Sequence, residues 1–183
     1  MNFSFWIESL STNVGLKVYK RAEKEGKLTA RVSLGVWIDP KEDDQAQISR
    51  LKSLFKSKGM LRINQIRMEM DGILNHTTAA LLDPYNTDYN LTRDGKNSGM
   101  VHFSQDRIKT FAKSLQNLIK FEGGFDVDLV CSGDRAVQEA LDALESVAND
   151  EDQRNRISNF ELISEDDIER FQKIGCIAVA QVC

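Results

Sequence analysis

Helix-like and strand-like segments alternate along most of the chain. Apolar residues recur every three or four positions in five stretches, which is typical of helices with one buried face. Between these stretches lie runs rich in β-branched and apolar residues, which predict strands. The predicted helices cover residues 13–25, 43–59, 104–123, 134–144 and 164–174, and the predicted strands cover residues 29–38, 61–70, 125–131, 157–163 and 176–182.

Capping and turn residues support these boundaries. Asp43 or Asp44 and Ser104 are predicted N-caps, because their side-chain oxygens can accept a hydrogen bond from the first turn of a helix. Gly26 and Gly175 fall where helices end, as expected for residues that adopt a left-handed conformation without strain. In the first helix, the four-residue spacing predicts an apolar stripe made of Val14, Val18 and Ala22.

Strands that alternate with helices predict an α/β fold with a parallel sheet. The last predicted strand is nearly all apolar from Ile177 to Ala180, which favours burial on both faces. Ligands bind at the carboxyl ends of such strands. The corresponding residues are 37–39, 67–72, 130–135, 159–161 and 181–183.

One long segment does not fit this alternation. Residues 71–99 mix Gly, Asn, Asp, Thr and Pro around a short apolar run, and they predict a long loop. No Pro-rich or low-complexity tract marks a linker elsewhere. We therefore expect a single α/β domain over residues 1–183.

Composition and charge narrow the class of protein. Lys and Arg number 24 and Asp and Glu number 28, so the formal net charge is 24 − 28 = −4, which argues against a nucleic-acid partner. No apolar stretch predicts a membrane span, and the first residues lack the basic region of a signal peptide. We expect a cytoplasmic protein with no membrane partner. The three cysteines, Cys131, Cys176 and Cys183, have no metal-site spacing and are expected to be reduced and mostly buried.

Five motifs occur in a fixed order at the ends and flanks of the predicted strands. They are Met70-Asp71-Gly72-Ile73, Thr78-Ala79-Ala80-Leu81-Leu82-Asp83-Pro84-Tyr85, Ser132-Gly133-Asp134-Arg135-Ala136-Val137, Arg156-Ile157 and Asp167-Ile168-Glu169-Arg170-Phe171. Together they resemble the YtcJ-like branch of the metal-dependent amidohydrolases, the amidohydrolase 3 family, from about Gly15 to Gln181. The resemblance implies a TIM-type barrel in which one or two divalent metals activate water to hydrolyse amide or related C–N bonds. Applied to this chain, it predicts a partial barrel of about five strands.

The metal ligands that the resemblance implies do not match this sequence. The position of a lysine that is often carboxylated holds Arg67, which stays protonated and cannot be a ligand. Two further positions that the resemblance assigns to histidine hold Val130 and Asn159. The segments for a first His-x-His pair and a last Asp are not recognised. We therefore expect no metal and no other cofactor.

The length of the chain also predicts a partial barrel. A complete barrel of this class needs ~250 residues. The chain has 183, so about three of the eight β/α units are expected to be missing. Both a natural remnant and an engineered fragment are compatible with this expectation.

Other residues are candidates for catalysis or substrate binding. Asp71, Cys131 and Asp134 are candidate catalytic residues, and Arg135 and His76 are candidate substrate-binding residues. Each also has a purely structural interpretation. Asp71 could stabilise a turn, Asp134 could be an N-cap with Arg135 beside it, and Cys131 could be a buried thiol. His76 and His102, the two histidines, could simply be solvated in the loop.

Two hypotheses follow. The first is a catalytically silent amidohydrolase-like fragment, a pseudoenzyme with a small-molecule cleft at the strand ends. The second is a hydrolase or lyase that acts on a small amide or ester without metal, through Cys131, Asp134, Arg67, Asp71 or His76. Because a partial barrel leaves two strand edges open, we also expect self-association, most simply as a homodimer.

Overall fold

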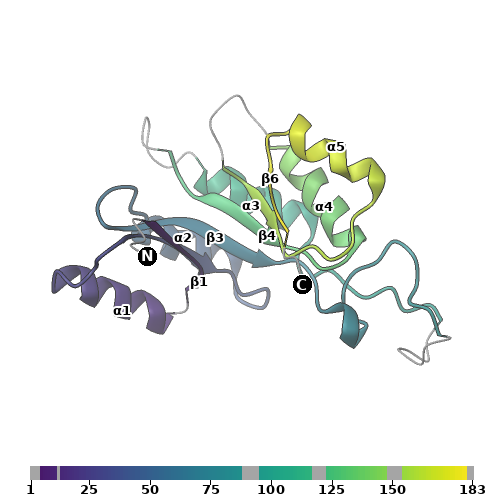
Figure 1. Cartoon of the computed structure of the whole chain (residues 1–183), viewed down its shortest axis with the longest axis horizontal. Coiled ribbons are helices and arrows are strands. Elements are labelled where there is room, and N and C mark those ends of the chain that lie inside the picture. Colours follow the sequence, from purple (N-terminus) through teal and green to yellow (C-terminus); the bar gives the residue numbers. More distant parts are fainter. Residues whose placement is uncertain (1–4, 12, 88–94, 117–122, 148–153, 181–183) are drawn as a thin grey trace. The chain divides into compact units, whose positions relative to one another are not determined.

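The computed structural model describes residues 5–11, 13–87, 95–116, 123–147 and 154–180 (Figure 1). Strands and helices alternate along it, as the sequence predicts. The elements are β1 (Phe5–Ser11), α1 (Asn13–Lys24), β2 (Arg31–Trp37), α2 (Asp44–Leu54), β3 (Leu61–Glu69), the 3₁₀ helix η1 (Leu74–His76), α3 (Gln105–Leu115), β4 (Asp126–Val130), α4 (Asp134–Glu145), β5 (Arg156–Ser158), α5 (Glu165–Lys173) and β6 (Ile177–Val179).

The strands follow one another in the sheet in the order β1-β2-β3-β4-β5-β6. Pairing is parallel between β1 and β2, between β2 and β3, and between β5 and β6. This confirms the predicted α/β fold of parallel βα repeats that form a partial TIM-type barrel. The described chain holds six strands rather than five, because β1 was not predicted.

Two compact units make up the chain. The first comprises Met1–Arg67 and Phe111–Asp128, and the second comprises Met68–Thr110 and Leu129–Cys183. The single domain expected over residues 1–183 stays a prediction. None of the described helices has the length and apolar character needed to cross a membrane.

In the first unit, α2 buries one face through Ile48 and Leu51. Asp43 caps this helix as predicted, because its carboxylate accepts a hydrogen bond from the Ala46 N–H at 2.8 Å. The helix ends at Leu54, earlier than predicted. Lys56 instead forms an antiparallel bridge with Ile63, in which each backbone N–H donates to the other residue's carbonyl.

The predicted buried stripe of α1 is wrong. Val14 is 71% exposed and Val18 is 60% exposed, whereas Leu16 is buried. The reason lies with Glu23, whose carboxylate accepts hydrogen bonds from Lys56 Nζ at 2.6 Å and from the Leu61 N–H at 3.2 Å. These contacts turn the Glu23 side of the helix toward Lys56 and Leu61. The spacing of apolar residues does not reveal an orientation that a polar residue sets.

In the second unit, α4 and α5 pack side by side (Figure 1). The predicted helix 134–144 is confirmed, and α4 buries Val137, Leu141 and Leu144 on one face. In α5, Phe171 is buried and its ring lies 5.7 Å from that of Phe160. Cys131 and Cys176 are buried and form no disulfide bond among the described residues, as expected, and Cys183 lies outside the described residues.

Two strand predictions in this unit are wrong. Strand β5 ends at Ser158 because Asn159 adopts a left-handed backbone with φ of 63°. Strand β6 is exposed on both faces, with Ile177 45% and Val179 39% exposed. Its apolar composition does predict a strand, but no described element covers either face.

The structure describes residues 71–87 and 95–99 of the predicted long loop, and η1 is the one regular element among them. Hydrogen bonds hold these residues in place. The Tyr85 hydroxyl donates to the Ala79 carbonyl at 2.9 Å, and the Asn97 side-chain amide donates to the Thr77 carbonyl at 3.0 Å. The loop is therefore fixed against the unit that carries the site.

Candidate functional site

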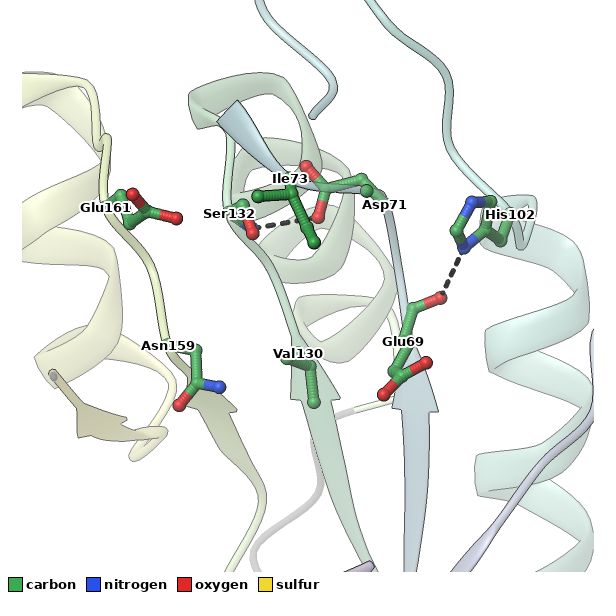
Figure 2. Close-up of a pocket in the computed structure, with 9 residues that line it drawn as sticks. Glu69, Asp71, Ile73, His102, Val130, Ser132, Asn159 and Glu161 are labelled. Atoms are coloured by element: carbon green, nitrogen blue, oxygen red, sulfur yellow. Dashed lines mark hydrogen bonds between the residues drawn. The ribbon is translucent and has the colours of Figure 1, made fainter. Parts of the chain in front are cut away.

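A pocket of about 520 Å³ lies in the second unit, at the carboxyl ends of β3, β4 and β5 (Figure 2). Glu161 and Asn159 lie on one side of Val130 in this view, and Glu69 and His102 lie on the other. This volume is in the range of small-molecule sites. The pocket is lined by Glu69, Asp71, Gly72, Ile73, His102, Val130, Ser132, Asn159 and Glu161.

Asp71 organises the base of this pocket. Its Oδ1 accepts a hydrogen bond from the Ser132 N–H at 2.8 Å, and its Oδ2 accepts from the N–H groups of Ala80 at 2.8 Å and Gly133 at 2.9 Å. Gly133 is the N-cap of α4, so the carboxylate lies where a helix N-terminus favours negative charge. Burial raises the pKa of the Asp71 carboxyl, and the three backbone N–H groups offset part of that effect.

The backbone of Gly133, one of the donors to Asp71, lies very close to the backbone of Ala80. A Cβ atom on Gly133 would overlap the carbonyl of Ala80, so this position admits no side chain without a backbone shift. Asp71 therefore holds the loop and the start of α4 together through Ala80, Ser132 and Gly133.

Glu161 is placed through the end of β4. The Ser132 carbonyl accepts hydrogen bonds from the N–H groups of Glu161 and Leu162, both at 3.2 Å. Ser132 in turn donates its own N–H to Asp71. A continuous chain of backbone contacts thus fixes the Glu161 side of the pocket relative to Asp71.

His102 is fixed at the end of β3. Its N–H donates to the Met70 carbonyl at 2.7 Å, and its Nδ1 lies 3.1 Å from the Glu69 carbonyl (Figure 2). Because a carbonyl oxygen only accepts hydrogen bonds, Nδ1 must carry the hydrogen in this contact. His102 is exposed, as the interpretation of a solvated histidine expected. The sequence did not reveal its contact with the end of β3, since that contact depends on the path of the loop.

Two of the positions at which the resemblance implied histidine ligands line the pocket. Val130 lies at the end of β4, and Asn159 follows β5. Asn is one of the few residues that tolerate the left-handed backbone found at Asn159. Neither side chain is a metal ligand of the kind that the resemblance implied.

Arg67, at the position where the resemblance implied a lysine, belongs to the first unit and is not among the pocket residues. Its Nη1 donates to Asp128 Oδ2 at 2.8 Å, with the two side chains 12% and 3% exposed. The guanidinium is therefore committed to a nearly buried ion pair.

The remaining candidates from sequence do not line the pocket. His76 is exposed at the end of η1, and Cys131 is fully buried. Asp134 is in the first turn of α4 rather than its N-cap, and its Oδ1 accepts from the Leu82 N–H at 2.9 Å. Arg135 donates to the carbonyls of Ser98 at 3.1 Å and Gly99 at 3.0 Å, so it supports the loop.

Sequence reasoning singled out neither Glu69 nor Glu161, although both fall within the strand ends it marked. Their position at or just after the ends of β3 and β5 was the available signal. Which of several polar residues there faces a pocket depends on strand register and on where β5 stops.

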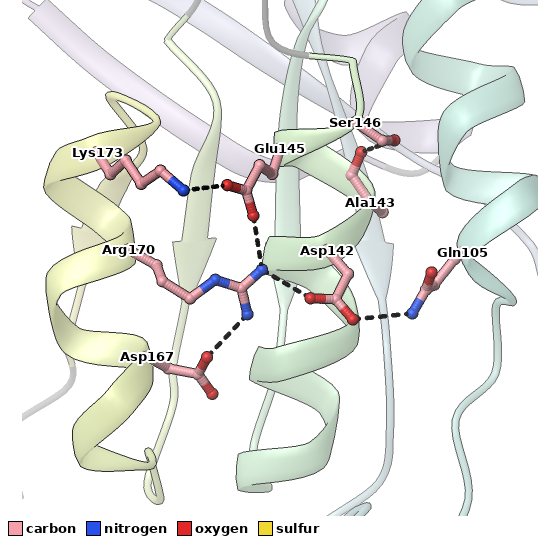
Figure 3. A network of polar contacts seen from close by, with 8 residues as sticks. All are labelled: Gln105, Asp142, Ala143, Glu145, Ser146, Asp167, Arg170 and Lys173. Atoms are coloured by element: carbon pink, nitrogen blue, oxygen red, sulfur yellow. Dashed lines mark hydrogen bonds and ion pairs between the residues drawn. The ribbon is translucent and has the colours of Figure 1, made fainter.

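A polar network holds α5 on α4 in the same unit (Figure 3). Arg170 of α5 donates to Asp142 at 2.6 Å and Glu145 at 3.1 Å on α4, and to Asp167 at 2.9 Å on its own helix. Lys173 donates to Glu145 at 2.7 Å. The two helices are therefore joined by cations from one side and carboxylates from the other.

The hydrogen bonds from Lys173, and then from Arg170, hold the pKa of Glu145 below its ordinary value of 4.5. A lowered pKa contributes stability above the ordinary value, and this contribution is lost as the pH falls through the lowered pKa. We expect Glu145→Gln to have a lower Tm than the wild type at pH 7, with the difference closing below pH 4.5. Differential scanning calorimetry between neutral and acid pH measures this, with Glu169→Gln, an exposed residue of α5, as control. A difference that stays constant with pH would contradict the expectation.

Comparisons with known proteins agree with the fold. The family model described as "Amidohydrolase family" matches residues 6–182.

Two solved structures are similar to this chain. A crystal structure of an uncharacterized metal-dependent hydrolase from Pyrococcus furiosus is 28% identical in sequence, with a TM-score of 0.73. The match covers 97% of this chain and 33% of that chain. That of an uncharacterized metal-dependent hydrolase from Pyrococcus horikoshii OT3 is 24% identical, with a TM-score of 0.73 over 95% of this chain and 32% of that chain. The chain thus spans about one third of each solved structure. No curated protein matches it significantly.

Proposed function

The chain belongs to the amidohydrolase family, and from this premise we propose that it binds a small molecule in the strand-end pocket without the metal-dependent hydrolysis that the resemblance implies. The observation that carries the proposal is the pocket itself. It lies at the ends of β3, β4 and β5, and Val130 and Asn159 line it where metal-binding histidines were implied. In this proposal the pocket at the strand ends still binds a ligand, while Val130 and Asn159 stand in place of the histidines that the resemblance implies.

The donor set in the pocket does not fit a divalent metal. The carboxylate oxygens of Asp71 already accept three backbone hydrogen bonds, and Asn159 and Val130 supply no imidazole. Glu69, His102 and Glu161 also line the pocket, but they are not grouped with one another or with Asp71 as metal ligands would be. Within the described ranges, no three His, Cys, Asp or Glu residues are grouped so that they could hold a metal ion.

The test is the metal content of the purified protein, together with its hydrolytic activity. We expect well under one divalent metal per chain after dialysis, no saturable binding of Zn²⁺ or Mn²⁺ in calorimetry, and no amide hydrolysis that a chelator abolishes. Stoichiometric metal, with activity that is lost in chelator, would refute the proposal.

A metal-free hydrolase has less support from the geometry. It would need a nucleophile and a base within hydrogen-bond reach of a bound substrate. Cys131 is fully buried away from the pocket lining, and Asp134 and Arg135 bond to the loop backbone. No single observation favours this second function.

We also propose that two copies associate through β6. This strand is last in the order of the described sheet, and it is short, apolar and exposed on both faces. Such an edge presents unpaired backbone groups to a second strand. Two copies of β6 can pair around a two-fold axis, which is the commonest symmetry of soluble oligomers.

Sedimentation velocity tests the association. We expect a dimer at micromolar concentration, and we expect Ile177→Lys with Val179→Lys to shift it to monomer, because buried lysines would lack partners. Ile168→Lys is a matched control, since Ile168 is an exposed apolar residue of α5. A wild-type protein that stays monomeric at this concentration would rule out the proposal.

A further inference from the structure

Carboxylates dominate the charge of the strand-end pocket. Glu69, Asp71 and Glu161 line it. Among the described residues that line it, none is Lys or Arg, and His102 is the one that can carry a positive charge. A cleft lined by charges of one sign raises the local concentration of ions of the opposite sign. A pocket with this lining favours a cation over an anion of the same shape.

The three carboxylates differ in how much of their hydrogen-bonding capacity is used. Asp71 is buried and already accepts three backbone N–H groups. In the part of the chain that the structure describes, the side chains of Glu69 and Glu161 form no hydrogen bond and no ion pair. Both can therefore accept hydrogen bonds from a ligand, while Asp71 holds the loop and the start of α4 in place.

The rest of the lining supplies shape and orientation. Ile73 and Val130 give the pocket an apolar portion, and Ser132 and Asn159 offer a hydroxyl and an amide (Figure 2). Glu161 and Glu69 lie on opposite sides of Val130 in this view, so a carboxylate flanks Val130 on either side of the pocket. An apolar body with a charged, hydrogen-bond-donating end matches these groups.

We propose that the ligand of this pocket is a small organic cation, an amine or amidinium on an apolar body, bound by the carboxylates of Glu69 and Glu161. This inference rests on the proposed function, in which the pocket binds a small molecule. It adds the charge and chemical class of that molecule. An amidinium presents N–H donors in a plane, as guanidinium does, and pairs well with a carboxylate.

The experiment compares three probes of nearly equal size and shape: benzamidine as the cation, benzamide as the neutral isostere and benzoate as the anion. Binding to the full chain is measured by ligand-observed NMR and calorimetry at pH 7. We expect benzamidine to bind at least about fivefold more tightly than the other two probes. We expect its affinity to fall with added salt, as screening of charges requires.

Variants locate the binding. Glu69→Gln and Glu161→Gln keep the size of each side chain and remove its charge, and each is expected to weaken benzamidine by about fivefold while leaving benzamide unchanged. Glu169→Gln, an exposed residue of α5 outside the pocket, is the control and should bind benzamidine like the wild type. Thermal unfolding of each variant confirms that the fold is intact.

The outcomes separate this inference from the proposed function. Equal or tighter binding of benzamide or benzoate, with competition among the three probes, overturns the cation assignment and leaves a small-molecule pocket. Benzamidine affinity that is unchanged in both glutamate variants also overturns the assignment. Stoichiometric metal in the purified protein overturns the proposed function, whatever the probes show.

Discussion

Replacing Asp71 with Asn is expected to lower the free energy of unfolding by about 2–4 kcal/mol. The carboxylate accepts three backbone N–H groups at 2.8 to 2.9 Å, from Ser132, Ala80 and Gly133. An amide of the same shape has one oxygen, so its NH₂ group must face at least one of these donors. The cost is the desolvation of buried donors that have lost their acceptor, together with the weaker attraction of a neutral group to the N-terminus of α4.

Urea unfolding and calorimetry measure this effect, and a loss of this size corresponds to a fall in Tm of about 4–16 °C for a chain of this length. Asp106→Asn is the matched control, because the Asp106 side chain is 96% exposed. The control is expected to change the stability by less than about 0.5 kcal/mol. Equal stabilities of Asp71→Asn and the wild type would mean that Asp71 does not hold the loop and α4 together.

Asp71 also shows what the sequence reveals about this site and what it does not. Its place after a predicted strand marked the carboxyl end of the sheet, and the pocket lies there. The sequence left open whether Asp71 faces a ligand or stabilises a turn, because the donors come from Ala80 in the loop and from Ser132 and Gly133 after the next strand. Partners that are distant in sequence have no local signature.

The same limit explains the errors in the fold. Helical and strand periods come from local steric and burial preferences, so the βα alternation could be predicted from the sequence. Burial of β6 depends on elements that would pack on it, and the exposure of Val14 and Val18 depends on the contacts that Glu23 makes with Lys56 and Leu61. Strand β1 was missed because its seven residues include few β-branched side chains. They form a strand by pairing with β2, which is distant in sequence.

The second large effect is expected for Arg67→Met, which should destabilise the protein by about 3–5 kcal/mol. The variant removes the guanidinium that donates to Asp128 at 2.8 Å and leaves the carboxylate of a 3% exposed side chain without this cation. Removing one partner of a buried pair costs more than the pair contributes, because the remaining charge stays desolvated. Methionine keeps much of the side-chain volume, so the loss reports on charge rather than on a cavity.

A double-mutant cycle separates these contributions. Arg67→Met combined with Asp128→Leu removes both charges, and we expect it to recover most of the stability that the single variant loses, as measured by urea unfolding. A double variant that is no more stable than Arg67→Met would show that packing, and not the ion pair, fixes this position. Recovery would show that Arg67 serves as the counter-ion of Asp128. The resemblance implies a metal-binding lysine at this position. Arg67 would then have a structural role there instead, as the partner of Asp128, and this role needs no metal.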